Sequence, residues 1–114
     1  MSVTSDISDW TFGQLGLDYD QINGSIPSSG DLKLFYDRSP SSYYQTVECR
    51  TLIMLGEMDL RVHPSQGKYW AQLLKGRLGE ENCMLYTFPD ANHGLETAES
   101  ERFGLQIIID FLKL

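Results

Sequence analysis

The sequence has few cysteines and no long hydrophobic run, and both features narrow the class of protein. Cys49 and Cys83 are the only cysteines. Their spacing forms no Cys-x-x-Cys motif, so we expect two reduced thiols in the core and no disulfide. No apolar run approaches the roughly 20 residues of a membrane-spanning helix. The first residues lack the basic start and apolar middle of a signal peptide, which predicts a cytoplasmic protein.

Basic side chains are also scarce. Nine Lys and Arg residues oppose sixteen Asp and Glu residues, which gives a formal net charge of -7. The first sixty residues hold most of the imbalance, with nine acidic and three basic side chains. Because an acidic surface repels phosphate backbones and anionic lipids, we expect neither nucleic acid nor a membrane as a partner.

With 114 residues, the chain is long enough for one domain at most. Residues 1–47 are rich in Ser, Asp, Gly and Tyr, and their turn signals predict short helices and loops. One short helix is expected from Ser8 or Asp9 toward Gly16, and another from Gly30 or Asp31. The many aromatic side chains of this part need a surface to pack on, which favours segments laid over a sheet.

Residues 48–114 predict a β-α-β-α unit. Residues 51–55 are apolar without alternation, as in a strand of a parallel sheet covered on both faces. Pro64 fits the first turn of a helix that runs to about Arg77 and stops at Gly79. Residues 83–88 form the second strand, and a crossover that contains a helix joins parallel neighbours. The expected apolar stripe of the helix consists of Tyr69, Trp70, Leu73, Leu74 and Leu78.

A last helix is expected to begin near Thr97, with acidic residues in its first turn. Its apolar residues occupy more than one side, so it needs more cover than two strands provide. A sheet of two strands is also marginal by itself. We therefore expect residues 1–114 to be part of a larger α/β domain.

Each predicted strand runs into a polar loop that carries a residue capable of acid–base chemistry. Asp59 follows the first strand and His93 follows the second. Because the carboxyl ends of parallel strands meet at one edge of the sheet, we expect the two side chains to meet there. Asp59 would then orient His93 through Nδ1, leaving Nε2 to take a proton from a serine hydroxyl.

These residues also have ordinary structural explanations. An Asp in a Gly-x-x-Asp loop often accepts hydrogen bonds from nearby amides, and a lone His before Gly is commonly a surface residue. His63 and Asp90 are the competing candidates. We expect His63 to be structural, since the positive end of the helix dipole beside Pro64 disfavours an imidazolium, and we expect Asp90 to shape its turn.

The nucleophile of such a triad is absent from the sequence. No Gly-x-Ser-x-Gly occurs in the 114 residues. The order Ser, Asp, His along the chain is that of α/β-hydrolases, which would put the serine before residue 1. We therefore expect no hydrolase activity from this chain alone.

The segments Asp-Leu-Arg-Val, residues 59–62, and Asn-His-Gly-Leu, residues 92–95, are the most specific motifs at this spacing. They resemble the corresponding segments of prolyl oligopeptidase-type serine peptidases, and within them of the acylaminoacyl-peptidases. The resemblance implies the C-terminal portion of an α/β-hydrolase domain, with parallel strands and flanking helices and with Asp59 and His93 as triad acid and base. Residues 4–10, 38–40, 52–58, 65–67 and 85–89 contribute further matches.

The chain also departs from the family pattern. Family members commonly have Pro directly after the Arg-Val pair, where this chain has His63 and then Pro64. The nucleophile turn, the oxyanion-hole segment and the β-propeller that precedes the hydrolase domain in full-length members have no counterpart in the 114 residues.

The function implied by the resemblance is release of an N-acylated amino acid from a short peptide, with a homo-oligomer as a possible assembly. No metal or organic cofactor is expected, because serine acyl transfer supplies its own nucleophile. Two alternatives stay open. One is a non-catalytic interaction or regulatory fragment, and the other is part of a carboxylesterase or lipase, since the same fold hosts many ester hydrolases.

Overall fold

Two parallel strands form the centre of the fold. The structure is a computed structural model, and it describes residues 29–113, so the helix expected between Ser8 and Gly16 lies outside the described residues. Strand β1 (Thr51–Gly56) pairs in parallel with β2 (Cys83–Phe88), in a register that runs from Thr51 opposite Cys83 to Gly56 opposite Phe88. Both strands agree with the prediction from the apolar runs.

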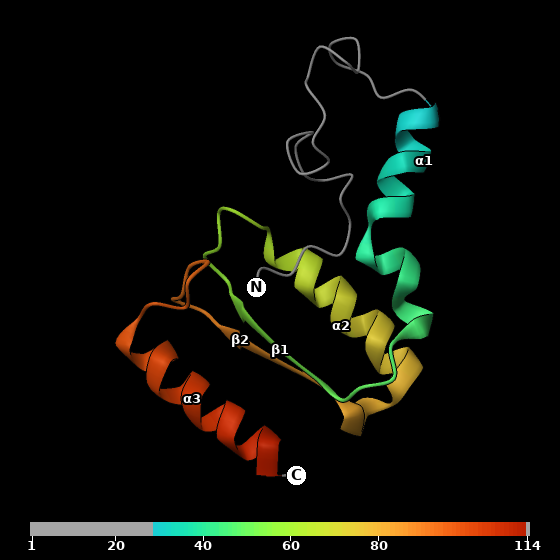
Figure 1. The fold of residues 1–114 in the computed structure, drawn as a ribbon. Coiled ribbons are helices and arrows are strands. Elements are labelled where there is room, and N and C mark those ends of the chain that lie inside the picture. Colours follow the sequence, from blue (N-terminus) through green and yellow to red (C-terminus); the bar gives the residue numbers. More distant parts are fainter. Residues whose placement is uncertain (1–28, 114) are drawn as a thin grey trace.

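Helix α2 (Pro64–Leu78) connects the strands and covers one face of the sheet (Figure 1). Pro64 occupies its first turn, and Gly79 ends it with a φ of 90°, a conformation that favours glycine. The core on this face joins the helix to both strands, with Ala71 and Leu74 packed against Ile53 and Cys83.

The predicted stripe of α2 was wrong in part. Tyr69 is exposed, and the residues that face the sheet include Gly67 and Ala71. The small residues went unnoticed because a search for large apolar side chains overlooks them, although a small side chain lets a helix approach a strand closely. A Cβ on Gly67 would meet the side chain of Leu55.

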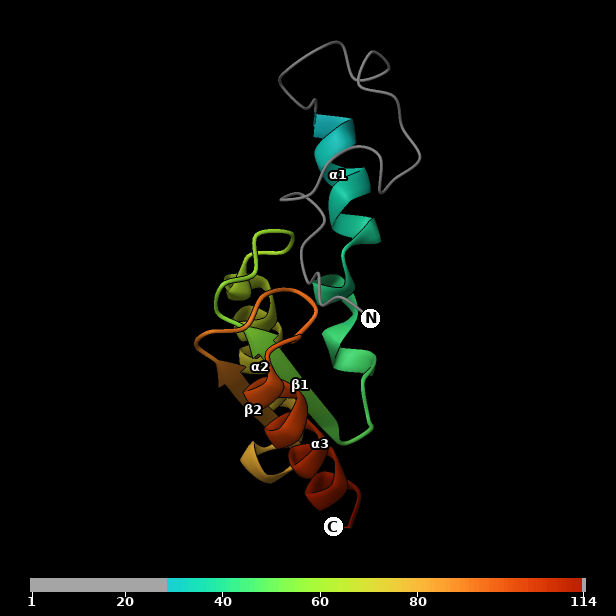
Figure 2. The same ribbon diagram turned by 90° about the vertical axis from the view of Figure 1, so that its left-hand side faces the viewer.

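Helix α3 (Ala98–Lys113) lies on the opposite face of the sheet, so that the strands are sandwiched between α2 and α3 (Figure 2). Gly104 is buried there, with its missing Cβ position 3.9 Å from Met54 Sδ and 4.0 Å from Phe88 Cζ. The expected excess of apolar residues is present on this helix, and several of them are exposed: Phe103, Leu105, Ile108, Ile109 and Leu112.

Three short elements complete the described part. Helix α1 (Ser29–Arg38) starts within one residue of the expected position and buries Phe35. The 3₁₀ helix η4 (Pro40–Thr46) packs against α2, and η5 (Glu80–Asn82) leads into β2. Among the described residues before β1, η4 packs against α2 and α1 contacts η4, so the main contacts of these elements are with helices and not with the sheet over which they were expected to lie.

The two cysteines are free thiols, as expected, but only one belongs to the core. Cys83 is buried at the start of β2, and burial raises the pKa of its thiol. The expectation of a core position for Cys49 was wrong, because it precedes β1 in an exposed segment.

Candidate active site

The carboxylate of Asp59 is fixed by the backbone of its own loop. Asp59 follows the end of β1, and its Oδ1 accepts hydrogen bonds from the amides of Arg61, at 2.8 Å, and Val62, at 2.9 Å. Because both amides bind the same oxygen, Oδ2 is turned away from the loop and toward the end of β2.

His93 lies on the loop that follows β2. The amide of Leu95 donates to the carbonyl of Asn92 at 3.2 Å, and the amide of Gly94 donates to Asn92 Oδ1 at 3.2 Å. These two bonds close a turn over residues 92–95 in which His93 is the first central residue.

The two loops bring Asp59 and His93 into direct contact. His93 Nδ1 lies 2.8 Å from Asp59 Oδ2, a short distance for a hydrogen bond between an imidazole and a carboxylate. The Asp59 side chain is 13% exposed and that of His93 31% exposed. The acid is thus shielded while the imidazole is accessible, and its Nε2 is the nitrogen left for exchange of a proton with another group.

The environment of Asp59 favours its charged form. Burial acts to raise the pKa of this carboxyl, but hydrogen bonds from the Val62 amide, the His93 imidazole and the Arg61 amide outweigh it. The pKa is therefore lowered from its ordinary value of 3.8. An ionised carboxylate at this position can accept a hydrogen bond from Nδ1–H of His93 at neutral pH.

Gly56 allows the two loops to lie this close together. It is the last residue of β1, and a Cβ on it would overlap the backbone oxygens of Ala91 and Asn92. The amide of Glu57 donates to Phe88 O at 3.0 Å, and that of Met58 donates to Ala91 O at 2.9 Å. The loop that carries the histidine is thus joined to the loop that carries the aspartate.

The competing candidates lie elsewhere. His63 is the N-cap of α2, where its side chain accepts a hydrogen bond from the amide of Ser65 at 3.2 Å. That is the structural role expected for it. Asp90 is exposed on the second loop, and its expected role in shaping the turn stays a prediction.

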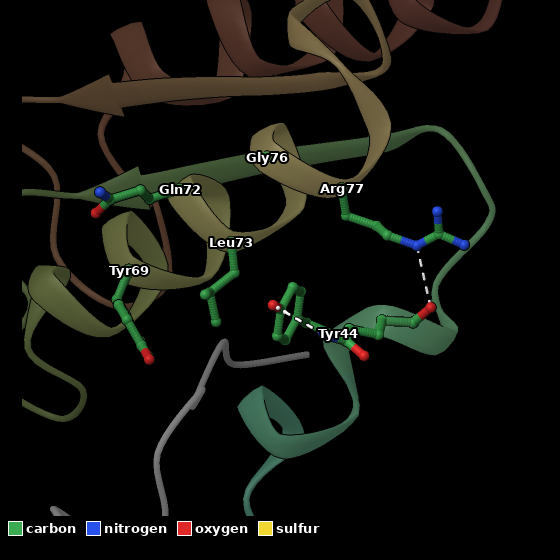
Figure 3. A pocket seen from close by; sticks show the side chains of 7 residues that line it. Tyr44, Tyr69, Gln72, Leu73, Gly76 and Arg77 are labelled. Atoms are coloured by element: carbon green, nitrogen blue, oxygen red, sulfur yellow. Dashed lines mark hydrogen bonds between the residues drawn. The ribbon is translucent and has the colours of Figure 1, made fainter.

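A hollow of about 390 Å³ lies beside the Asp59–His93 pair. Side chains and backbone of both loops line it: Met58, Leu60, Arg61, Asn92, His93, Gly94 and Glu96. A larger hollow of about 650 Å³ lies between η4 and α2, where Tyr44, Tyr69 and Leu73 converge and Arg77 donates to Gln45 O (Figure 3). Neither Asp59 nor His93 borders the larger hollow, so the chemistry of the pair places the candidate site at the smaller one.

The sequence indicates that an Asp in such a loop can accept hydrogen bonds from nearby amides, but it does not identify the groups that fix the pair. These are the amides of Arg61 and Val62 and the bare Cα of Gly56. The Gly-x-x-Asp spacing signals a tight loop, but a sequence does not show which carboxylate oxygen accepts from which amide.

The described residues carry no other obvious centre of chemistry. Among residues 29–113, no group of three or more His, Cys, Asp and Glu side chains is arranged to hold a metal ion. None of the helices in that range is long and apolar enough to cross a membrane.

Parallel strands between two helical layers, with a His–Asp contact beyond their carboxyl ends, are features of the α/β-hydrolase class. Comparison with protein families agrees, since the model of the prolyl oligopeptidase family matches residues 4–114. The chain belongs to this family, and its fold is the C-terminal portion of an α/β-hydrolase domain with a parallel sheet.

Curated relatives give a more detailed comparison. The chain is 36% identical over 99 residues to acylamino-acid-releasing enzyme 2 of Oryza sativa subsp. japonica, which covers 86% of this chain and 13% of the rice protein. It is 34% identical over 101 residues to acylamino-acid-releasing enzyme of Rattus norvegicus, and this match covers 89% of this chain and 13% of the rat protein. Acylamino-acid-releasing enzyme of Homo sapiens is 31% identical over 98 residues, and this match covers 86% of this chain and 13% of the human protein. The chain thus spans a small part of the length of these relatives.

Proposed function

We propose that the chain supplies the acid and the base of a serine peptidase that releases an N-acylated amino acid from a short peptide. The observation that carries this proposal is the 2.8 Å contact between Asp59 Oδ2 and His93 Nδ1 at the carboxyl ends of two parallel strands. The substrate class follows the relatives, which are called acylamino-acid-releasing enzymes. The proposal includes a cytoplasmic location, which rests on sequence features alone.

The residues would act on a serine in the following way. The serine oxygen bonds to the carbonyl carbon of the acylated residue while its proton moves to His93 Nε2. The C–N bond to the rest of the peptide then breaks, and His93 returns the proton to the leaving amine. Water, activated by the same imidazole, releases the acylated amino acid from the serine. Asp59 keeps His93 in the Nδ1–H tautomer and stabilises the imidazolium.

The serine itself must come from polypeptide outside the 114 residues, because no Gly-x-Ser-x-Gly occurs within them. A site built from two parts of a polypeptide is consistent with the exposure of His93, whose imidazole is accessible from the side of the hollow.

A chimera tests this proposal directly. In acylamino-acid-releasing enzyme 2 of rice, the segment that aligns with this chain is replaced by the sequence of this chain. We expect the chimera to cleave an acetyl-alanyl amide, and the release of acetyl-alanine measures it. A folded chimera that binds the amide without cleaving it would argue against the proposal, and faster cleavage of simple esters than of the amide would favour a carboxylesterase.

A second candidate function is a non-catalytic interaction fragment. The apolar side chains exposed on α3, among them Phe103, Leu105 and Leu112, favour this alternative. The chimera separates the two functions, since the interaction hypothesis requires no catalytic competence of Asp59 and His93.

A further inference from the structure

The turn that carries His93 ends in a strained residue. Leu95 has a φ of 52°, and it is the only non-glycine residue with positive φ in residues 29–113. A leucine avoids this left-handed region because its Cβ approaches the backbone too closely. Something in the surrounding structure must hold Leu95 there.

Ser100 provides such a restraint. This residue is 2% exposed in the first turn of α3, and its Oγ donates to the carbonyl oxygen of Leu95 at 2.7 Å. The same Oγ accepts from the hydroxyl of Thr97 at 2.7 Å, while Thr97 Oγ1 accepts from the Ser100 amide at 3.0 Å. Ser100 Oγ also lies 2.9 Å from Thr97 O, but its single proton has the shorter contact with Leu95 O.

The restraint reaches His93 through the turn. The amide of Leu95 donates to Asn92 O at 3.2 Å, so the orientation of the Leu95 peptide sets the closure of the turn in which His93 lies. The φ of Leu95 relates the peptide that carries this amide to the next peptide, whose carbonyl Ser100 holds against α3. With that carbonyl held, a change to negative φ would tilt the preceding peptide, move its amide away from Asn92 O and change the direction of the His93 side chain. The contact with Asp59 at 2.8 Å depends on that direction.

We propose that Ser100 is a positioning residue that aims the imidazole of His93 at Asp59 by holding Leu95 in the left-handed conformation. This inference rests on the proposed function, in which His93 is the base. It assigns to a buried serine of α3 a role in the geometry of the site without placing that serine in contact with substrate.

The test measures the tautomer of His93 in the 114-residue chain. The two imidazole ¹⁵N shifts, recorded at a pH where the ring is neutral, report which nitrogen carries the proton, and hydrogen bonding to Asp59 selects Nδ1–H. We expect Nδ1–H in the unaltered chain and its loss in Ser100→Ala. Thr97→Ala is the matched control, because it removes the side-chain cap of α3 but leaves the Ser100–Leu95 hydrogen bond.

A rescue variant separates positioning from mere stabilisation. Glycine adopts the left-handed conformation without strain, so Leu95→Gly should restore Nδ1–H in the Ser100→Ala background. Retention of Nδ1–H in Ser100→Ala, or equal loss in Thr97→Ala, would overturn the inference while leaving the proposed function intact. If Ser100→Ala does not fold, the double variant decides, since it must fold and show Nδ1–H. Absence of Nδ1–H from the unaltered chain would instead remove the Asp59–His93 pair and the proposed function with it.

Discussion

Asp59 serves two local structures with one carboxylate. Oδ1 closes its own loop through two backbone amides, and Oδ2 meets His93. The ordinary structural explanation for an Asp in such a loop and the proposed functional one therefore hold together. The sequence indicates that Asp59 and His93 meet, because apolar runs show where the strands end. It does not show that Oδ1 accepts from backbone amides while Oδ2 contacts His93, because this depends on the three-dimensional geometry of the loops.

The catalytic assignment makes a direct prediction for the two histidines. In the chimera, His93→Ala should lower kcat/KM by about 10⁴-fold, because the base that activates the serine is lost. His63→Ala is the control, since His63 caps α2 and should keep most of the activity. Steady-state hydrolysis of the acetyl-alanyl amide measures both. A larger loss from His63→Ala than from His93→Ala would reverse the assignment of the base.

The lowered pKa of Asp59 makes a second prediction, for stability at acidic pH. A carboxyl whose pKa is lower in the folded state stabilises the fold above its ordinary pKa of 3.8, and this contribution is lost as the pH falls through the lower folded value. Asp59→Asn should therefore lose stability relative to the unaltered chain at neutral pH, and the difference should shrink below about pH 3.8.

Urea unfolding of the two chains at a series of pH values measures this difference. His93→Ala is the matched comparison and should keep part of the effect, because the Arg61 and Val62 amides still bind Asp59. If the difference in free energy of unfolding between Asp59→Asn and the unaltered chain were the same at all pH values, the pKa of Asp59 would not be lowered by folding.

At the scale of elements, local sequence patterns predict where the strands and long helices begin and end, but they do not predict which faces of these elements pack together. The bounds of β1, β2, α2 and α3 lie within a few residues of the predicted ones. The buried face of α2 differs from the predicted stripe, because Gly67 lets the helix approach Leu55 while Tyr69 turns toward η4. Which side of a helix meets a sheet is decided by such close approaches between distant residues, which periodicity alone cannot show.

The close contact at the end of β1 gives a third prediction. Gly56→Ala should lower the free energy of unfolding by about 1–3 kcal/mol, since the new methyl group would overlap backbone oxygens of Ala91 and Asn92 that have little room to move. Chemical denaturation measures the change. The same substitution should also weaken the Asp59–His93 contact, because it pushes the second loop away from the first.

A second glycine provides the control for this experiment. Gly76 lies in α2 with nothing within 4 Å of its missing Cβ, so Gly76→Ala should raise the free energy of unfolding by up to about 1 kcal/mol through helix propensity. If Gly56→Ala were as well tolerated as Gly76→Ala, the loops would not depend on a bare backbone at the end of β1.

At the scale of the whole molecule, Asp59 and His93 are brought together, but a nucleophile turn of the Gly-x-Ser-x-Gly type has no counterpart in the sequence. Asp59 and His93 are 34 positions apart, and a single crossover through α2 between parallel strands brings them together. The sheet has two strands in the described residues, and the outer side of α3 exposes several large apolar side chains. The sequence predicted that two strands would leave part of the last helix uncovered, because its apolar residues occupy more than one side.

The fourth prediction concerns reactivity of the chain as it stands. A fluorophosphonate probe should label no serine of the 114-residue chain, because no serine lies on a nucleophile turn of the Gly-x-Ser-x-Gly type. The chimera with the rice enzyme should be labelled under the same conditions. Gel fluorescence and mass spectrometry of the adduct measure the outcome, and a labelled serine within residues 1–114 would contradict the prediction.

Within residues 29–113, the hydrogen bonds on Asp59, on His93 and on the turn that carries His93 come from residues between the end of β1 and the first turn of α3. In this part of the chain, one continuous stretch therefore supplies both residues of the pair and the hydrogen bonds that orient them. Recombination or gene fission that moved this stretch as a unit would carry two of the three residues of the proposed triad together to a new genetic context.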